Sequence, residues 1–103
     1  MTYELIQKIL KELGITYTYY QFKGPVKSPK YIAYYEISKN PEYADDKVYH
    51  FEPSFAVELY TKDKDVATEN KLIALFAKYE VPWDGGVSTY IDTEKVYETV
   101  FYV

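Results

Sequence analysis

The chain has 103 residues, 48% of them hydrophobic, and a formal net charge of −4 at pH 7. This length predicts one domain over residues 1–103, with a modest core. Cys and Arg are absent. Without Cys, the chain has no disulfides and no Cys-based zinc site. Without Arg, it is a poor candidate for binding nucleic acid, because nucleic-acid-binding proteins commonly contact phosphate and guanine through Arg. No apolar run is long enough to span a membrane, so no membrane partner is expected.

The N-terminal stretch predicts a helix over Thr2–Leu13. Thr2 can cap its first turn and Gly14 can end it. Its apolar residues form one stripe of the width that packs on a core. Met1–Glu4 lacks the basic flank of a signal peptide, so we expect a cytoplasmic protein.

Two stretches of alternating residues, Ile15–Phe22 and Tyr31–Ser38, predict strands. The second has apolar side chains on both faces, which indicates a central or covered strand. Between them, Lys23–Lys30 contains Gly and Pro residues and is interpreted as a hairpin loop. Its Lys residues, which include Lys27 and Lys30, are either simply solvated or in contact with an acidic neighbour.

The next stretch is polar. Lys39–Lys47 is expected to be a loop, and it contains Asp45 and Asp46. Val48–Phe51 is expected to begin a long strand that continues through Tyr60, with a Pro at a bulge or edge.

The clearest unit is a strand that leads into a helix. Ser54–Tyr60 alternates apolar and polar residues, and Val66–Tyr79 has its apolar residues on one helical face. Asp65 is placed to cap the helix, because its carboxylate can accept hydrogen bonds from the first turn. We expect the helix to cover the strand through Ile73 and Phe76.

The C-terminal stretch predicts a strand pair. Val81–Gly86 is interpreted as a turn, and Val87–Ile91 and Val96–Val103 as strands joined by a tight connection. Few helices separated by hairpins predict an α+β fold, with an antiparallel β-sheet and two helices packed on one face.

Residues that could carry chemistry do not form a recognisable set. His50 is the only His, and with Asp45 and Asp46 it does not supply metal ligands at a suitable spacing. Glu36, Glu58 and Glu98 lie in predicted strands, and two of them that face each other could act as acid and base, but polar positions on a solvent face explain them more simply. We therefore expect no enzyme activity, no catalytic residue, no metal and no cofactor.

The last predicted strand places a carboxylate among apolar side chains. One of its faces carries Val96, Glu98, Val100 and Tyr102. If Glu98 points away from the helices, these apolar residues do too, and so much apolar area on a helix-free face favours a partner. Ordinary surface Tyr and Val are an equally good explanation, because much protein surface is apolar.

Short motifs follow one another along most of the chain. They are Tyr31–Tyr35, Tyr43–Tyr49, Val57–Thr61 with Lys64 and Asp65, Val81–Trp83, Tyr90–Ile91 and Glu94–Tyr97. Their succession resembles the small tail-completion proteins of long-tailed phages and prophages from low-GC Gram-positive bacteria. These proteins are tail terminators or head–tail joining proteins.

The resemblance implies an α+β subunit that forms a ring, expected to be a hexamer, at the head-facing end of the tail tube. Its partners would be copies of itself, the tail tube protein and the head connector protein. It would assemble in the cytoplasm and become a virion component. The family is not enzymatic. The alternative function is a small ligand- or peptide-binding module that uses the open sheet face.

A ring needs heterologous contacts, so the face that carries Glu98 should meet a different patch on the neighbouring subunit. Lys27 or Lys30 could then approach Glu98 or the acidic loop of Asp45 and Asp46. The expected interface residues are Val96, Glu98, Val100, Tyr102, Tyr60, Lys27, Lys30, Asp45 and Asp46.

Overall fold

The structure, a computed structural model, describes residues 1–26, 28–45 and 47–103. Lys27 and Asp46, for which contacts are predicted above, lie outside the described residues. The elements in chain order are α1 (Tyr3–Leu13), β1 (Thr16–Tyr19), β2 (Lys30–Ser38), β3 (Pro41–Ala44), β4 (Lys47–Phe51), β5 (Ser54–Thr61), α2 (Val66–Lys78), β6 (Asp84–Ile91) and β7 (Val96–Tyr102).

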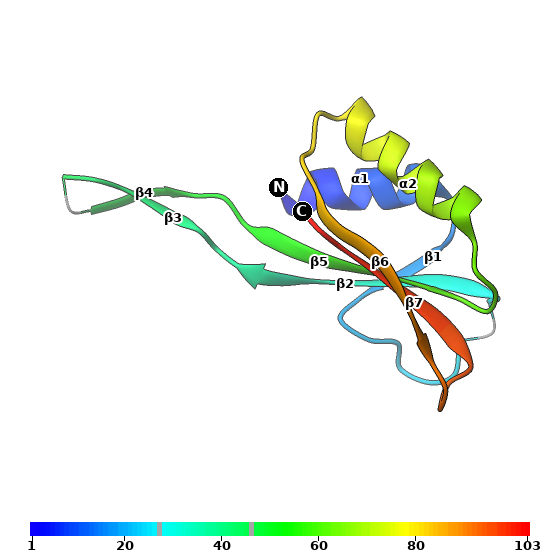
Figure 1. The fold of residues 1–103 in the computed structure, drawn as a ribbon. Helices are drawn as coiled ribbons and strands as arrows, with labels where there is room; N and C mark the ends of the chain where they lie inside the picture. The colour runs from blue at the N-terminus through cyan, green and yellow to red at the C-terminus, as the bar shows by residue number, and fades with distance from the viewer. Residues whose placement is uncertain (27, 46) are drawn as a thin grey trace.

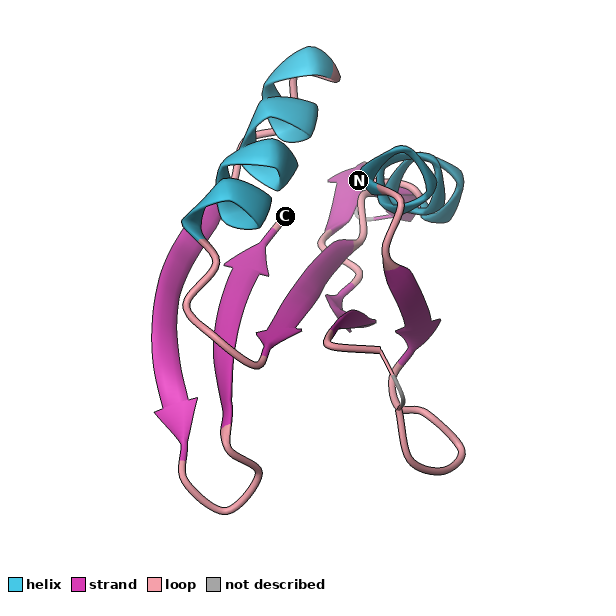
Figure 2. Ribbon diagram, turned by 90° about the vertical axis from the view of Figure 1, so that its right-hand side faces the viewer, coloured by secondary structure: helices cyan, strands magenta, loops and turns pink. Residues whose placement is uncertain are grey.

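The main sheet has five strands in the order β1-β2-β5-β7-β6, and β3 and β4 form a separate two-stranded sheet. Both helices cover the same face of the main sheet, as Figures 1 and 2 show. The α+β fold with two helices on one face is therefore confirmed. The sheet is mixed, because β1 and β2 run parallel while its other described pairings are antiparallel.

The parallel pairing of β1 with β2 corrects the prediction of a hairpin. Thr16 is opposite Tyr31 and Tyr19 is opposite Tyr34, so residues 20–29 form a crossover connection between two parallel strands. Tyr20, with a φ of 68°, turns the chain away from β1. Alternation does not set strand direction, and this connection is longer than the ~2–5 residues of most hairpin loops. We call residues 20–29 the crossover loop.

A second difference concerns β3 and β4, which prolong the β2–β5 hairpin into a projecting arm (Figure 1). We call residues 41–51 the arm. A polar loop was predicted where β3 lies, and β4 was predicted to be continuous with β5. The pattern missed β3 because its described side chains, Pro41, Glu42 and Tyr43, are all exposed, and an exposed strand needs no apolar alternation. At the base of the arm, the Asn40 side-chain nitrogen donates to the Glu52 carbonyl at 3.0 Å.

The helix ends follow the predicted caps. Thr2 Oγ1 accepts from the Leu5 backbone N–H at 3.1 Å, and Asp65 Oδ1 accepts from the Thr68 N–H at 3.0 Å. Gly14 ends α1 in the left-handed conformation, with a φ of 80°. The two caps fix where each helix starts, and therefore which of its faces is turned to the sheet.

The core lies between the two helices and the sheet. Its buried hydrophobic members are Ile6, Ile9, Leu10, Leu13, Ile32, Tyr34, Phe55, Val57, Leu59, Leu72, Phe76 and Phe101. Leu59 and Phe76 are fully buried, as predicted, and Ile73 packs partly buried against them. Val66, on the predicted apolar face of α2, is instead 52% exposed, because it is the first residue of the helix.

The Asp65 cap gives a testable pH dependence of stability. Its carboxylate accepts from the Thr68 hydroxyl, the Thr68 N–H and the Lys30 ammonium. We expect Asp65→Ala to lower the free energy of unfolding by about 1–2 kcal/mol at pH 7. The matched control is Asp63→Ala, because Asp63 is exposed and lies two positions earlier. Urea unfolding should show a change below about 0.5 kcal/mol for this control.

The sign of the pH effect follows from the same contacts. Hydrogen bonds from Thr68, then the Lys30 ammonium, lower the pKa of Asp65 below its ordinary 3.8. The contribution of the charged carboxylate is therefore complete above pH 3.8 and is lost as the pH falls through the lower pKa of the folded state. The advantage of the wild type over Asp65→Asn should shrink in that acid range, and an advantage that stays constant down to pH 2 would contradict this.

Candidate interaction surface

The sheet face opposite the helices, which we call the helix-free face, is built from four strands. It carries Tyr31, Ala33 and Tyr35 of β2, Ala56, Glu58 and Tyr60 of β5, Val96, Glu98, Val100 and Tyr102 of β7, and Val87 of β6. The residues between them in β7, Thr99 and Phe101, are buried on the helix side. The alternation in the last strand therefore predicted the orientation of Glu98 and its apolar neighbours.

The β7 part of this face forms an apolar strip open to solvent. Val100 is paired with Glu58 on one side and Val87 on the other. Val87 is 76% exposed and Tyr102 is 47% exposed, while Val96 and Val100 are half-buried. Contiguous apolar residues on a solvent face are typical of a surface that binds another protein.

Two carboxylates interrupt the strip, and both are bound by tyrosines. The Tyr60 hydroxyl lies 2.7 Å from Glu98 Oε2 and 3.1 Å from Glu58 Oε1, and the Tyr35 hydroxyl lies 3.3 Å from Glu58 Oε2. Burial, and then the hydrogen bond to Glu98, raise the pKa of Tyr60 well above its ordinary value. The tyrosines therefore stay neutral, and the carboxylates of Glu58 and Glu98 can attract a cation from a partner.

The crossover loop covers one end of the helix-free face and leaves a cavity of about 210 Å³. The cavity is lined by Tyr20, Gln21, Phe22, Val26, Tyr31, Ala33, Tyr60 and Glu94. Tyr31 is stacked on Tyr60 with ring centroids 5.0 Å apart, and Phe22 meets Tyr31 edge-on at 5.5 Å. An aromatic wall of this kind favours an apolar or aromatic guest.

The residues predicted for an interface are only partly brought together. Val96, Glu98, Val100, Tyr102 and Tyr60 share the helix-free face. Lys30 does not, because its ammonium binds Asp65 Oδ2 at 3.2 Å and Thr68 Oγ1 at 3.1 Å on the helix side. Asp45 is exposed at the turn of the arm, with a φ of 53°.

Sequence reasoning missed the cavity and the arm. Phe22 and Tyr31 were assigned to the two strands of a hairpin, and that assignment does not place a loop against the helix-free face. The signal that could have revealed the cavity is the length of the Gly- and Pro-containing connection, which is too long for a tight turn. The arm has a weaker signal, the Pro41–Ala44 segment with an exposed Tyr43.

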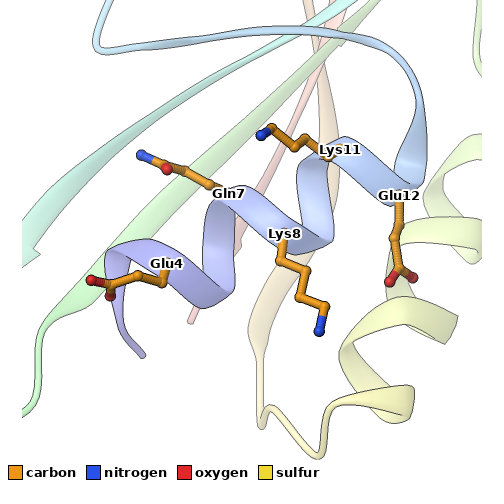
Figure 3. Close-up of a pocket in the computed structure, with 5 residues that line it drawn as sticks. All are labelled: Glu4, Gln7, Lys8, Lys11 and Glu12. Carbon is orange, nitrogen blue, oxygen red and sulfur yellow. The ribbon is translucent and has the colours of Figure 1, made fainter.

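A second cavity, of about 440 Å³, lies on the outer side of α1 and is drawn in Figure 3. Its lining side chains of Glu4, Gln7, Lys8, Lys11 and Glu12 spread apart from one another in that view. Glu12 accepts hydrogen bonds from Tyr79 and Lys78, which lower its pKa. Gln7 donates to the Tyr34 hydroxyl at 3.1 Å. These contacts tie α1 to α2 and to the sheet, so the cavity has no converging set of groups.

Among the residues that the structure describes, no three His, Cys, Asp or Glu side chains are grouped to hold a metal ion. Over the same residues, neither helix is long and apolar enough to cross a membrane. No protein-family model and no curated protein sequence matches the chain.

Proposed function

We propose that the chain is a structural subunit of a phage or prophage particle, a tail terminator or head–tail joining protein that forms a ring capping the tail tube. The succession of motifs from Tyr31 to Tyr97 supports this through its resemblance to tail-completion proteins. The ring would contact the tail tube protein on one side and the head connector on the other. The subunit would then be part of the virion.

The observation that carries the proposal is the composition of the helix-free face. It combines exposed Val87 and Tyr102 with half-buried Val100 and a tyrosine-bound pair of carboxylates. An apolar strip with fixed charges at its centre has the anatomy of a protein interface, in which apolar contacts give affinity and charges set register. The acid pair has no cationic partner in its own hydrogen-bond network among the described residues, so a neighbouring subunit can supply one.

The test is the substitution Val100→Lys. We expect it to abolish ring formation and to give overlong tails in an assembly assay, because it places an ammonium in the middle of the apolar strip. The monomer should stay folded, since Val100 faces away from the core and its cross-strand neighbour Glu58 can pair with the new charge. Sedimentation velocity reports the oligomer, electron microscopy the tail length, and circular dichroism the fold.

The matched control is Val66→Lys, the same change at a 52% exposed site on α2. It should leave rings and tail length unchanged. Tails of normal length in Val100→Lys would show that this face is ordinary surface. Unfolding of Val100→Lys would show that Val100 serves the core.

The aromatic cavity favours a second candidate function, a small ligand- or peptide-binding module. Tyr31, Tyr60 and Phe22 give it a wall that a free aromatic ligand could also fill. A chain that stays monomeric at high concentration, with saturable shifts of its Tyr31 and Tyr60 NMR signals on adding an aromatic peptide, would favour the module over the ring subunit.

A further inference from the structure

The arm projects beyond the main sheet, and those of its side chains that the structure describes are exposed. Among the described residues, β3 and β4 pair only with each other, while the strands on either side belong to the main sheet. Tyr43 on the arm is 64% exposed and Phe51 is 49% exposed. A two-stranded hairpin by itself is marginally stable in water. Packing against another surface would therefore stabilise the arm.

The crossover loop offers the complementary charge. Residues 41–51 contain one Glu and two Asp against one Lys, which sums to −2 with His50 neutral. Residues 20–29 contain two Lys and no acidic residue, which sums to +2. At the positions that the structure describes, exposed Asp45 of the arm and exposed Lys23 of the crossover loop carry opposite charges, which steer the two segments toward each other and disfavour contact between like segments.

The two segments cannot meet within one chain. The crossover loop leads into the first residue of β2, and the arm follows its last residue. At ~3.3 Å per residue, Tyr43 lies roughly 35–40 Å from Tyr31 along this strand. The longest dimension of the molecule, 50 Å, is consistent with that separation. Contact between arm and crossover loop therefore has to join two copies.

The cavity beside the crossover loop can accept a side chain from the arm. Its volume of about 210 Å³ is enough for one aromatic ring, and Phe22 and Tyr31 already meet edge-to-face at its wall. Aromatic pairs in such arrangements gain stability beyond the area they bury. Tyr43 is the exposed aromatic residue of the arm nearest to the acidic turn at Asp45.

We propose that the arm of one copy docks on the crossover loop of a second copy, with Tyr43 entering the cavity that Phe22 and Tyr31 line. This inference rests on the proposed ring and adds, beside the apolar strip around Val100, a pair of unlike patches that each subunit would use. A contact between unlike patches is heterologous, so repetition of it closes a ring when the rotation between subunits allows.

The Cys-free chain permits a direct test by crosslinking. In a variant with Lys47→Cys and Gln21→Cys, which keeps Tyr43, a short bismaleimide should join neighbouring copies and give a ladder of covalent multimers, because Lys47 is exposed on the arm and pairs with Ala44 next to Tyr43. Gln21 is exposed and lines the cavity. The control pairs Lys47→Cys with Val66→Cys, whose position is exposed on α2, and it should give monomers.

A charge exchange tests the same contact without crosslinker. Asp45→Lys or Lys23→Glu alone should weaken self-association, measured by sedimentation, at least about tenfold, because each places like charges together. The two changes combined should restore self-association to within about threefold of the wild type. Tyr43→Ser should weaken it without unfolding the body.

The outcomes separate this inference from the proposed function. Rings that form normally in Tyr43→Ser, without a crosslink to position 21, would overturn the docking of the arm and leave the ring intact. A chain that never self-associates would contradict both. A ladder in the Gln21 pair, together with rescue by the charge exchange, would support both.

Discussion

Replacing Phe76 by Ala should lower the free energy of unfolding by about 3–5 kcal/mol. Phe76 is fully buried, and its ring meets that of Phe101 in β7 at 5.8 Å, so its removal leaves a cavity between α2 and the sheet. This is a large share of the ~5–15 kcal/mol of a typical domain. Urea unfolding monitored by circular dichroism measures the change.

The control for Phe76→Ala is Val66→Ala in the same helix. Val66 is 52% exposed, so its truncation should cost less than about 0.5 kcal/mol. A loss below about 1 kcal/mol in Phe76→Ala would show that the site collapses around the smaller side chain, or that α2 is rotated relative to the sheet.

Gly85→Ala should also be strongly destabilising, by about 2–4 kcal/mol. Gly85 has a φ of 82°, where an L side chain is strained, and an added Cβ would lie 2.5 Å from the Val100 carbonyl oxygen. That oxygen belongs to the backbone of β7, so it cannot move without disturbing the β6–β7 pairing. The register shift between Gly85 and Val87 is the feature that creates this close approach.

Gly14→Ala provides the matched control for Gly85→Ala. Gly14 has nearly the same φ, 80°, but an added Cβ there would meet nothing closer than 4.0 Å. Its loss should be about 1–2 kcal/mol, the conformational cost alone. The difference between the two variants in urea unfolding then measures the steric clash. Equal losses would show that β6 shifts to accommodate the side chain.

The sequence predicted well those elements that have one buried face and one solvent-exposed face. The stripe of α1, the alternation of β5 and the Asp65 cap each reflect contact with the core or a defined hydrogen bond. Phe101 and Glu98 point to opposite faces of β7 for the same reason. A burial pattern determines such features locally, so one sequence is enough to recognise them.

The parts that were missed depend on relations a burial pattern does not encode. The alternation of β1 is the same whether it runs parallel or antiparallel to β2, and β3 is exposed on both sides. Lys30 was grouped with Lys27 as a surface charge. Side chains alternate along β2, so Lys30 points to the same side of the sheet as Ile32 and Tyr34, where it binds Asp65. The aromatic cavity follows from the crossover, so it was missed with it.

The arm has a consequence for the order in which the protein becomes rigid. Among the described residues, its strands pair only with each other, beyond the core that stabilises β2 and β5. Such a segment opens locally at a free energy far below that of global unfolding. Its amide hydrogens should therefore exchange with solvent rapidly in the free subunit, while those of β5 exchange slowly. If the arm docks on a second copy as proposed, slow exchange in the arm would be a property of the assembled protein, and assembly would also complete the folding of each subunit.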